Sequence, residues 1–93
     1  ISSWSVEMIV DAINIFFEQE DELGLDKYEL NLSDVYGDEG IIRYKNDGQD
    51  AKKSVSWGDD DYAWIYSRHS CGIITKFHLK DYLDEKKYQV KTV

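Results

Sequence analysis

The chain has 93 residues and a mass of 10.9 kDa, so we expect residues 1–93 to fold as a single domain. Hydrophobic residues make up 42% of the chain and include three Trp, seven Tyr and three Phe, which excludes a disordered acidic tail. The single cysteine, Cys71, excludes an internal disulfide and fits a reducing compartment. No apolar stretch reaches the ~20 residues that a membrane span requires.

The net charge of −8 is distributed unevenly along the chain. Residues 1–61 carry sixteen acidic and five basic residues, a net charge of −11, whereas residues 62–93 carry three acidic and six basic residues, a net charge of +3. Clustered carboxylates repel one another and destabilise a compact state, so we expect a fold that keeps them to use them. Adaptation to high salt is the weaker interpretation, because nine Lys remain and the acids are concentrated in one part of the chain.

The first predicted element is an amphipathic helix that starts at a cap on Ser3 or Ser5. Its apolar stripe has helical spacing and consists of Val6, Ile9, Val10, Ile13, Phe16 and Phe17. Polar residues recur on the opposite side, at Glu7, Asp11, Asn14, Glu18 and Asp21 or Glu22. Gly24 is suited to ending the helix in a left-handed conformation.

After the helix, the hydrophobic pattern changes to a period of two. We predict strands over residues 28–33, 41–45, 53–57, 62–67 and 71–77, separated by turns at 37–40, 46–48 and 58–61. Residues 79–87 suit a short amphipathic helix, and residues 89–93 an edge strand or a frayed end. The expected architecture is α+β: an N-terminal helix packed on a meandering antiparallel sheet of four to five strands, with a candidate short C-terminal helix.

The acidic residues of the helix and of the loops are the candidate partner-binding residues. They are Glu7, Asp11, Glu18, Glu20, Asp21, Glu22, Asp26, Asp34, Asp38, Glu39, Asp59, Asp60 and Asp61. Carboxylates four residues apart on a helix are about 6 Å apart along its axis, and DNA carries one phosphate per ~3.4 Å on each strand. A basic surface that binds phosphates would accept such a row, although a solvated helix face explains most single charge runs.

The sequence offers little for catalysis or for a cofactor. Asp59 to Asp61 lack the ligand spacing of a calcium loop, and His69, Cys71 and His78 are too few for a structural zinc site. A Cys–His nucleophilic pair is an open alternative, since such pairing is spatial. We expect no metal, no cofactor and no enzymatic activity. Among the aromatic residues, Trp57 beside the acidic loop is the one expected to contact a partner.

The acidic helix from Trp4-Ser5-Val6-Glu7 to Glu20-Asp21-Glu22, followed by acidic hairpins, resembles the phage-encoded DNA-mimic proteins. Among these, the chain is most similar to the anti-restriction nuclease (Arn) type of T-even phages. The resemblance implies a dimeric inhibitor that occupies the DNA-binding surface of a host restriction enzyme or histone-like nucleoid protein, in the cytoplasm of an infected bacterium. The basic C-terminal third departs from DNA-like character, as a dimer contact or as a surface that dilutes the acidic one.

We therefore expect a non-enzymatic inhibitor that presents carboxylates in place of phosphates. The alternative is an immunity protein or antitoxin that blocks one cognate nuclease toxin through a few buried hot spots. Binding of nucleic acid by the chain itself is disfavoured, because the molecule as a whole would repel phosphate.

Overall fold

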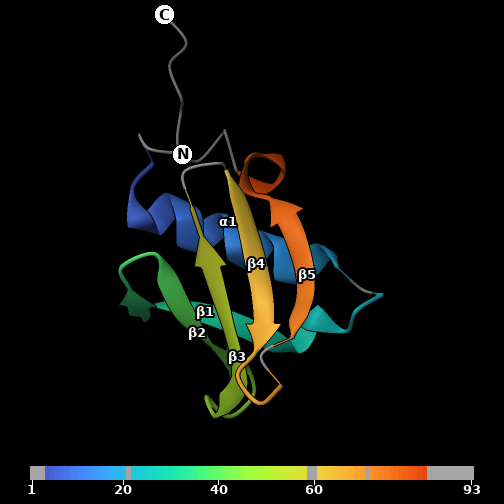
Figure 1. Ribbon diagram of the computed structural model, residues 1–93. Coiled ribbons are helices and arrows are strands. Elements are labelled where there is room, and N and C mark those ends of the chain that lie inside the picture. The colour runs from blue at the N-terminus through green and yellow to red at the C-terminus, as the bar shows by residue number, and fades with distance from the viewer. Residues whose placement is uncertain (1–3, 21, 59–60, 71, 84–93) are drawn as a thin grey trace, which may run out of the picture.

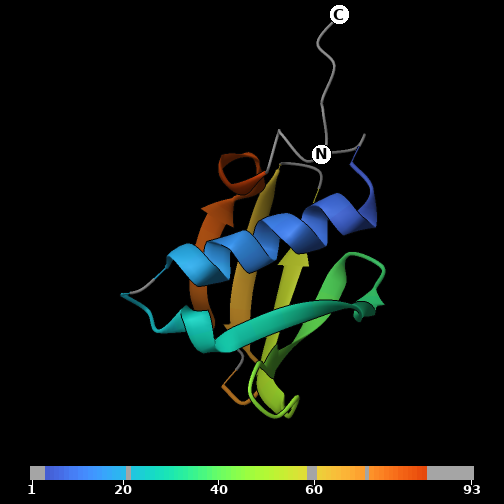
Figure 2. The ribbon, with the colours of Figure 1, turned by 180° about the vertical axis from the view of Figure 1, so that it is seen from behind.

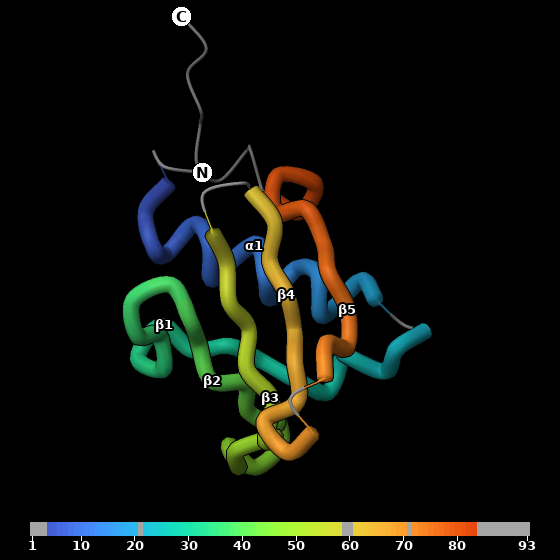
Figure 3. Tube along the Cα trace, viewed as in Figure 1, coloured from blue at the N-terminus to red at the C-terminus, as the bar shows by residue number. Residues whose placement is uncertain are grey.

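The computed structural model describes residues 4–20, 22–58, 61–70 and 72–83. Its helices are α1 (Val6–Gln19) and two 3-10 helices, η1 (Leu25–Lys27) and η2 (Leu79–Tyr82). Its strands are β1 (Tyr28–Tyr36), β2 (Glu39–Tyr44), β3 (Asp50–Trp57), β4 (Tyr62–Ser67) and β5 (Ile73–His78). The strands form one antiparallel sheet in the order β1-β2-β3-β4-β5, a meander that can be followed in Figure 3. The predicted α+β architecture is confirmed.

Helix α1 begins where the sequence provides a cap and ends earlier than the sequence pattern indicates. The Ser5 hydroxyl accepts a hydrogen bond from the Met8 N–H at 3.3 Å. The helix ends at Gln19, and Gly24 instead has its left-handed φ of 65° just before η1. The expected stop at Gly24 is therefore wrong. Carboxylates at Glu20 and Glu22 follow the carboxyl end of the helix, where the helix dipole disfavours negative charge.

The core lies between α1 and one face of the sheet (Figure 2). In α1 its side chains are those of the predicted stripe except exposed Val6, joined by Ala12. Across the sheet, Val55 is paired with Ile65, so that both point to the same side. Trp57 is buried in this core with 6% of its surface exposed, so the expectation that it contacts a partner is wrong. Trp57 lies two residues after Val55 in β3, so its side chain is on the same side of the sheet and faces α1.

The free edge of β1 is closed by a side chain of α1. The Asn14 amide donates to the Leu30 carbonyl and accepts from the Leu30 N–H, both at 2.8 Å. It thus reproduces the pairing of a neighbouring strand at one position. Asn14 was expected on the acidic side of the helix, but it lies at the border of that side and is partly buried against β1.

The C-terminal predictions are only partly covered by the structure. Leu79–Tyr82 form a 3-10 helix with Leu79 buried, and it ends at Leu83, whose backbone is extended. Residues 84–87 of the expected helix and the 89–93 strand lie outside the described residues, as does Cys71. Within the described ranges, no helix is both long enough and apolar enough to cross a membrane.

Candidate functional site

The acidic residues of α1 share the side of the helix that faces away from the sheet. At 3.6 residues per turn, Glu7, Asp11 and Glu18 fall within about 40° of one another around the helix axis. Glu7 and Glu18 are exposed and Asp11 is partly exposed. Their Cα atoms are about 6 Å and 10 Å apart along the axis. We call these three residues the acidic helix face; Figure 2 shows the outer side of α1 toward the viewer.

Two further carboxylates continue this negative region beyond the end of α1. Glu22 and Asp26 are both exposed in the segment that leads to β1, at the left of Figure 2. Neither they nor Glu7 and Glu18 form an ion pair with any lysine or arginine among the described residues. Their charge is therefore directed to solvent. Glu20 turns inward instead: it is partly buried, and its charge adds to burial in raising the pKa of Tyr82.

The first hairpin supplies a separate pair of acids. Asp38 and Glu39 are exposed at the β1–β2 turn, where Gly37 has a φ of 64°. The turn lies toward the end of the molecule where α1 begins, at the right of Figure 2, whereas the segment between α1 and β1 lies at the left, near the other end of the helix. The hairpin acids thus extend the negative surface without being part of the acidic helix face.

Asp34 has a structural role and is not part of the exposed surface. It is 8% exposed, and its carboxylate accepts hydrogen bonds from Arg43 Nε at 2.8 Å and Nη2 at 3.2 Å. Asn31 Nδ2 approaches the same carboxylate at 3.4 Å. The hydrogen bonds from Arg43 hold the pKa of Asp34 below its usual value, although burial alone would raise it. The arrangement joins β1 to β2 where their register shifts.

The remaining predicted site residues fall into two groups. Asp61 is partly buried and its carboxylate lies 3.0 Å from Lys80 Nζ, so a cation of the C-terminal third offsets its charge. Asp21, Asp59 and Asp60 lie outside the described residues. The structure therefore brings together Glu7, Asp11 and Glu18, with Glu22 and Asp26 as an extension.

The opposite face of the sheet, which no element covers in Figure 1, was not predicted as a candidate surface. Strand β4 places Tyr62, Trp64 and Tyr66 on this side, because Ala63 and Ile65 between them point into the core. The ammonium group of Lys76 lies over the rings of Tyr62 at 4.4 Å and Trp64 at 5.5 Å. We call this side the open sheet face. The alternation over residues 62–67 could have indicated this aromatic face, but from it only a strand was predicted.

Among the described residues, no group of three His, Cys, Asp or Glu side chains is placed to hold a metal ion. No protein-family model, curated protein or solved structure matches the chain.

Proposed function

We propose that this protein is a non-enzymatic inhibitor that binds a basic DNA-binding protein in place of DNA. The observation that carries the proposal is the acidic helix face, with its extension through Glu22 and Asp26. Glu7, Glu18, Glu22 and Asp26 are exposed and form no ion pair with a lysine or arginine of the described residues. Glu7 and Glu18 are in addition held on a regular helix. A rigid row of charges loses little conformational entropy when it binds.

The dimensions of the row support contact with a surface that binds phosphate. Successive carboxylates on the helix are separated by about 6 to 10 Å along the axis, which corresponds to two or three phosphate steps of one DNA strand at ~3.4 Å each. Lysine and arginine side chains are long and flexible enough to adjust to this spacing. The partner classes are those that the resemblance suggests, a restriction endonuclease or a histone-like nucleoid protein in a bacterial cytoplasm.

A competition experiment tests the proposal directly. Fluorescently labelled duplex DNA is bound to a purified histone-like nucleoid protein, or to a restriction endonuclease without Mg²⁺, and this protein is titrated in. We expect release of DNA, measured by a fall in anisotropy, at 50 mM salt and much weaker release at 300 mM salt, because exposed charges are screened. Absence of release from both probes at 50 mM salt would contradict the proposal.

Matched variants identify the surface responsible. The double variant Glu7→Gln/Glu18→Gln should release DNA only at several-fold higher protein concentration, because two of the exposed charges on the helix are lost. Asp47→Asn is the control: it removes an exposed charge in the β2–β3 turn, away from α1, and keeps the Oδ1 atom that accepts from the Gln49 N–H. A loss from Asp47→Asn as large as that from Glu18→Gln alone, which also removes one charge, would show that net charge, and not the acidic helix face, governs binding.

A further inference from the structure

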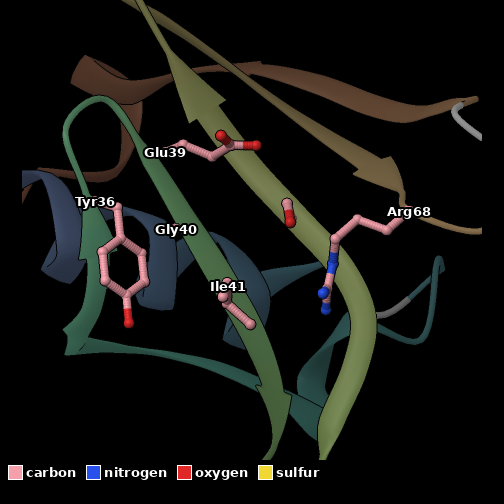
Figure 4. A pocket seen from close by; sticks show the side chains of 6 residues that line it. Tyr36, Glu39, Gly40, Ile41 and Arg68 are labelled. Carbon is pink, nitrogen blue, oxygen red and sulfur yellow. The ribbon is translucent and has the colours of Figure 1, made fainter.

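A hollow of about 210 Å³ lies on the open sheet face, on the side of the molecule away from α1. It is lined by Tyr36, Glu39, Gly40, Ile41, Ser54 and Arg68 (Figure 4). The hollow exists because the part of β3 beside it presents the small side chains of Ser54 and Ser56 on this face, while Val55 and Trp57 fill the core. Its volume is below the ~300–1,000 Å³ of typical small-molecule sites, so one side chain is a better fit than a cofactor.

The floor of the hollow offers an unused hydrogen-bonding group. Ser54 is only 2% exposed, and its hydroxyl forms no hydrogen bond with another described residue. Among the described residues, no fully buried side-chain oxygen or nitrogen lacks a partner, so this hydroxyl must meet solvent where Ser54 lines the hollow. A serine hydroxyl has two lone pairs, so a hydroxyl without a hydrogen-bond partner can accept a hydrogen bond from a donor that enters the hollow.

The walls combine apolar surface with one uncompensated negative charge. Tyr36 is 64% exposed and Ile41 is partly buried, and both contribute carbon surface beside the hollow. Arg68 is drawn across β3 by its ion pair with Asp50, which offsets its positive charge. Glu39 forms no ion pair with a lysine or arginine of the described chain. Glu39, Arg68 and the Asp50 that pairs with Arg68 together carry a formal charge of −1. Figure 4 shows the Glu39 carboxylate at the edge of the hollow.

We propose that this hollow binds one arginine side chain of a partner protein. The aliphatic stem would pack on Ile41, and the planar guanidinium would stack on the Tyr36 ring while donating to the Glu39 carboxylate and the Ser54 hydroxyl. Lysine fits less well, because its ammonium is compact and strongly hydrated and cannot stack or donate in two directions in one plane. The site takes from the proposed function only the assumption that the partner is basic, and it lies on the face opposite α1.

The test uses blocked single amino acids, so that no partner needs to be known. The ¹⁵N-labelled protein is titrated at low salt with N-acetylarginine amide, and separately with the lysine and norleucine amides. We expect the arginine probe to shift the amide signals of Gly40, Ile41 and Ser54 in a saturable way, about two- to fivefold more tightly than the lysine probe. Stronger or equal binding of norleucine, or shifts spread over the acidic helix face alone, would overturn the proposal.

Two exposed positions give variants that leave the core intact. Glu39→Gln and Tyr36→Leu should each weaken the arginine probe about two- to fivefold, whereas Asp38→Asn, which removes a charge next to Glu39 but does not line the hollow, should leave its affinity nearly unchanged. Equal effects of Glu39→Gln and Asp38→Asn would refute a specific site.

The two proposals fail separately. Glu7→Gln/Glu18→Gln should impair release of DNA and leave binding of the arginine probe intact. Binding of the arginine probe in a protein that releases no DNA would support the hollow and refute the proposed function. Release of DNA without specific binding of the arginine probe would support the proposed function and refute the arginine site in the hollow.

Discussion

Asn14 binds the backbone of Leu30 through both ends of its side-chain amide, at 2.8 Å each. A sheet edge with unpaired backbone groups invites pairing with other chains, and a helix or side chain that covers it prevents this. We predict that Asn14→Ala lowers the free energy of unfolding by about 1–3 kcal/mol, because two partly buried backbone groups lose their partner. Urea denaturation measures the loss, with exposed Gln19→Ala as the control on the same helix. Similar midpoints for the two variants would contradict it.

Asp34 makes stability depend on pH in a defined direction. Its pKa is lowered in the folded state by the hydrogen bonds from Arg43, so the folded protein binds its proton less readily than the unfolded chain. The stabilisation is complete above the unfolded value of about 3.9 and is lost as the pH falls through the folded pKa. Asp34→Asn should lower stability at pH 7 and reduce the proton uptake on acid unfolding by up to about one proton. Denaturation between pH 2 and 7 tests this; an unchanged slope would contradict it.

The helix and the existence of five strands were predicted from the spacing of apolar residues together with the turn signals between the strands. The 3.6-residue stripe of α1 and the two-residue alternation of Tyr28–Leu30 and Ala63–Ile65 each require one buried side, and the structure buries those sides. The roles of single polar residues could not be predicted in this way. Asn14 and Asp34 look like surface residues in a pattern, but their partners are 16 and 9 residues away in the chain and depend on how the elements pack.

The open sheet face was missed for a related reason. The alternation of Ser54 and Ser56 with Val55 and Trp57 predicts a strand, but it does not reveal that no second layer covers the serine side. Covering depends on the number of helices and on the side to which α1 packs. Both are properties of the assembled fold, and the hollow over Ser54 follows from them.

The response of binding to charge removal on α1 distinguishes the proposed DNA mimic from the alternative, an immunity protein or antitoxin. If the acidic helix face acts as a phosphate-like row, then Glu7→Gln, Asp11→Asn and Glu18→Gln should each weaken release of DNA by a similar small factor, about two- to fivefold. The double variant Glu7→Gln/Glu18→Gln should approach the product of its two factors, because these residues are about 16 Å apart along the helix axis. A toxin-specific inhibitor would instead lose binding abruptly at one hot spot. Anisotropy competition with each single and double variant gives the result, and an abrupt loss at one position would favour the alternative.

At the scale of the whole molecule, folding mixes the acidic and basic parts of the sequence in space. Arg68 and Lys80, both from the basic third, pair with Asp50 and Asp61 from the acidic part. Lys76 lies on the open sheet face over aromatic rings. The charge asymmetry of the chain is therefore partly cancelled at these places and survives on α1 and in the segment after it. A count of charges along the sequence indicates an acidic molecule, but it does not indicate which face is acidic.

This distribution leads to a prediction about the kinetics of binding. A negative face on a molecule with a net charge of −8 attracts a basic partner from a distance, which raises the association rate and leaves the dissociation rate to short-range contacts. With an immobilised histone-like nucleoid protein as the probe, we expect the association rate constant to fall by about tenfold or more between 50 and 300 mM salt. The dissociation rate constant should change much less over the same range. Glu18→Gln should flatten the salt dependence of association more than Asp47→Asn does, although each removes one exposed charge. An association rate that is independent of salt, with all of the salt effect in dissociation, would show that short-range contacts and not the acidic helix face control recognition.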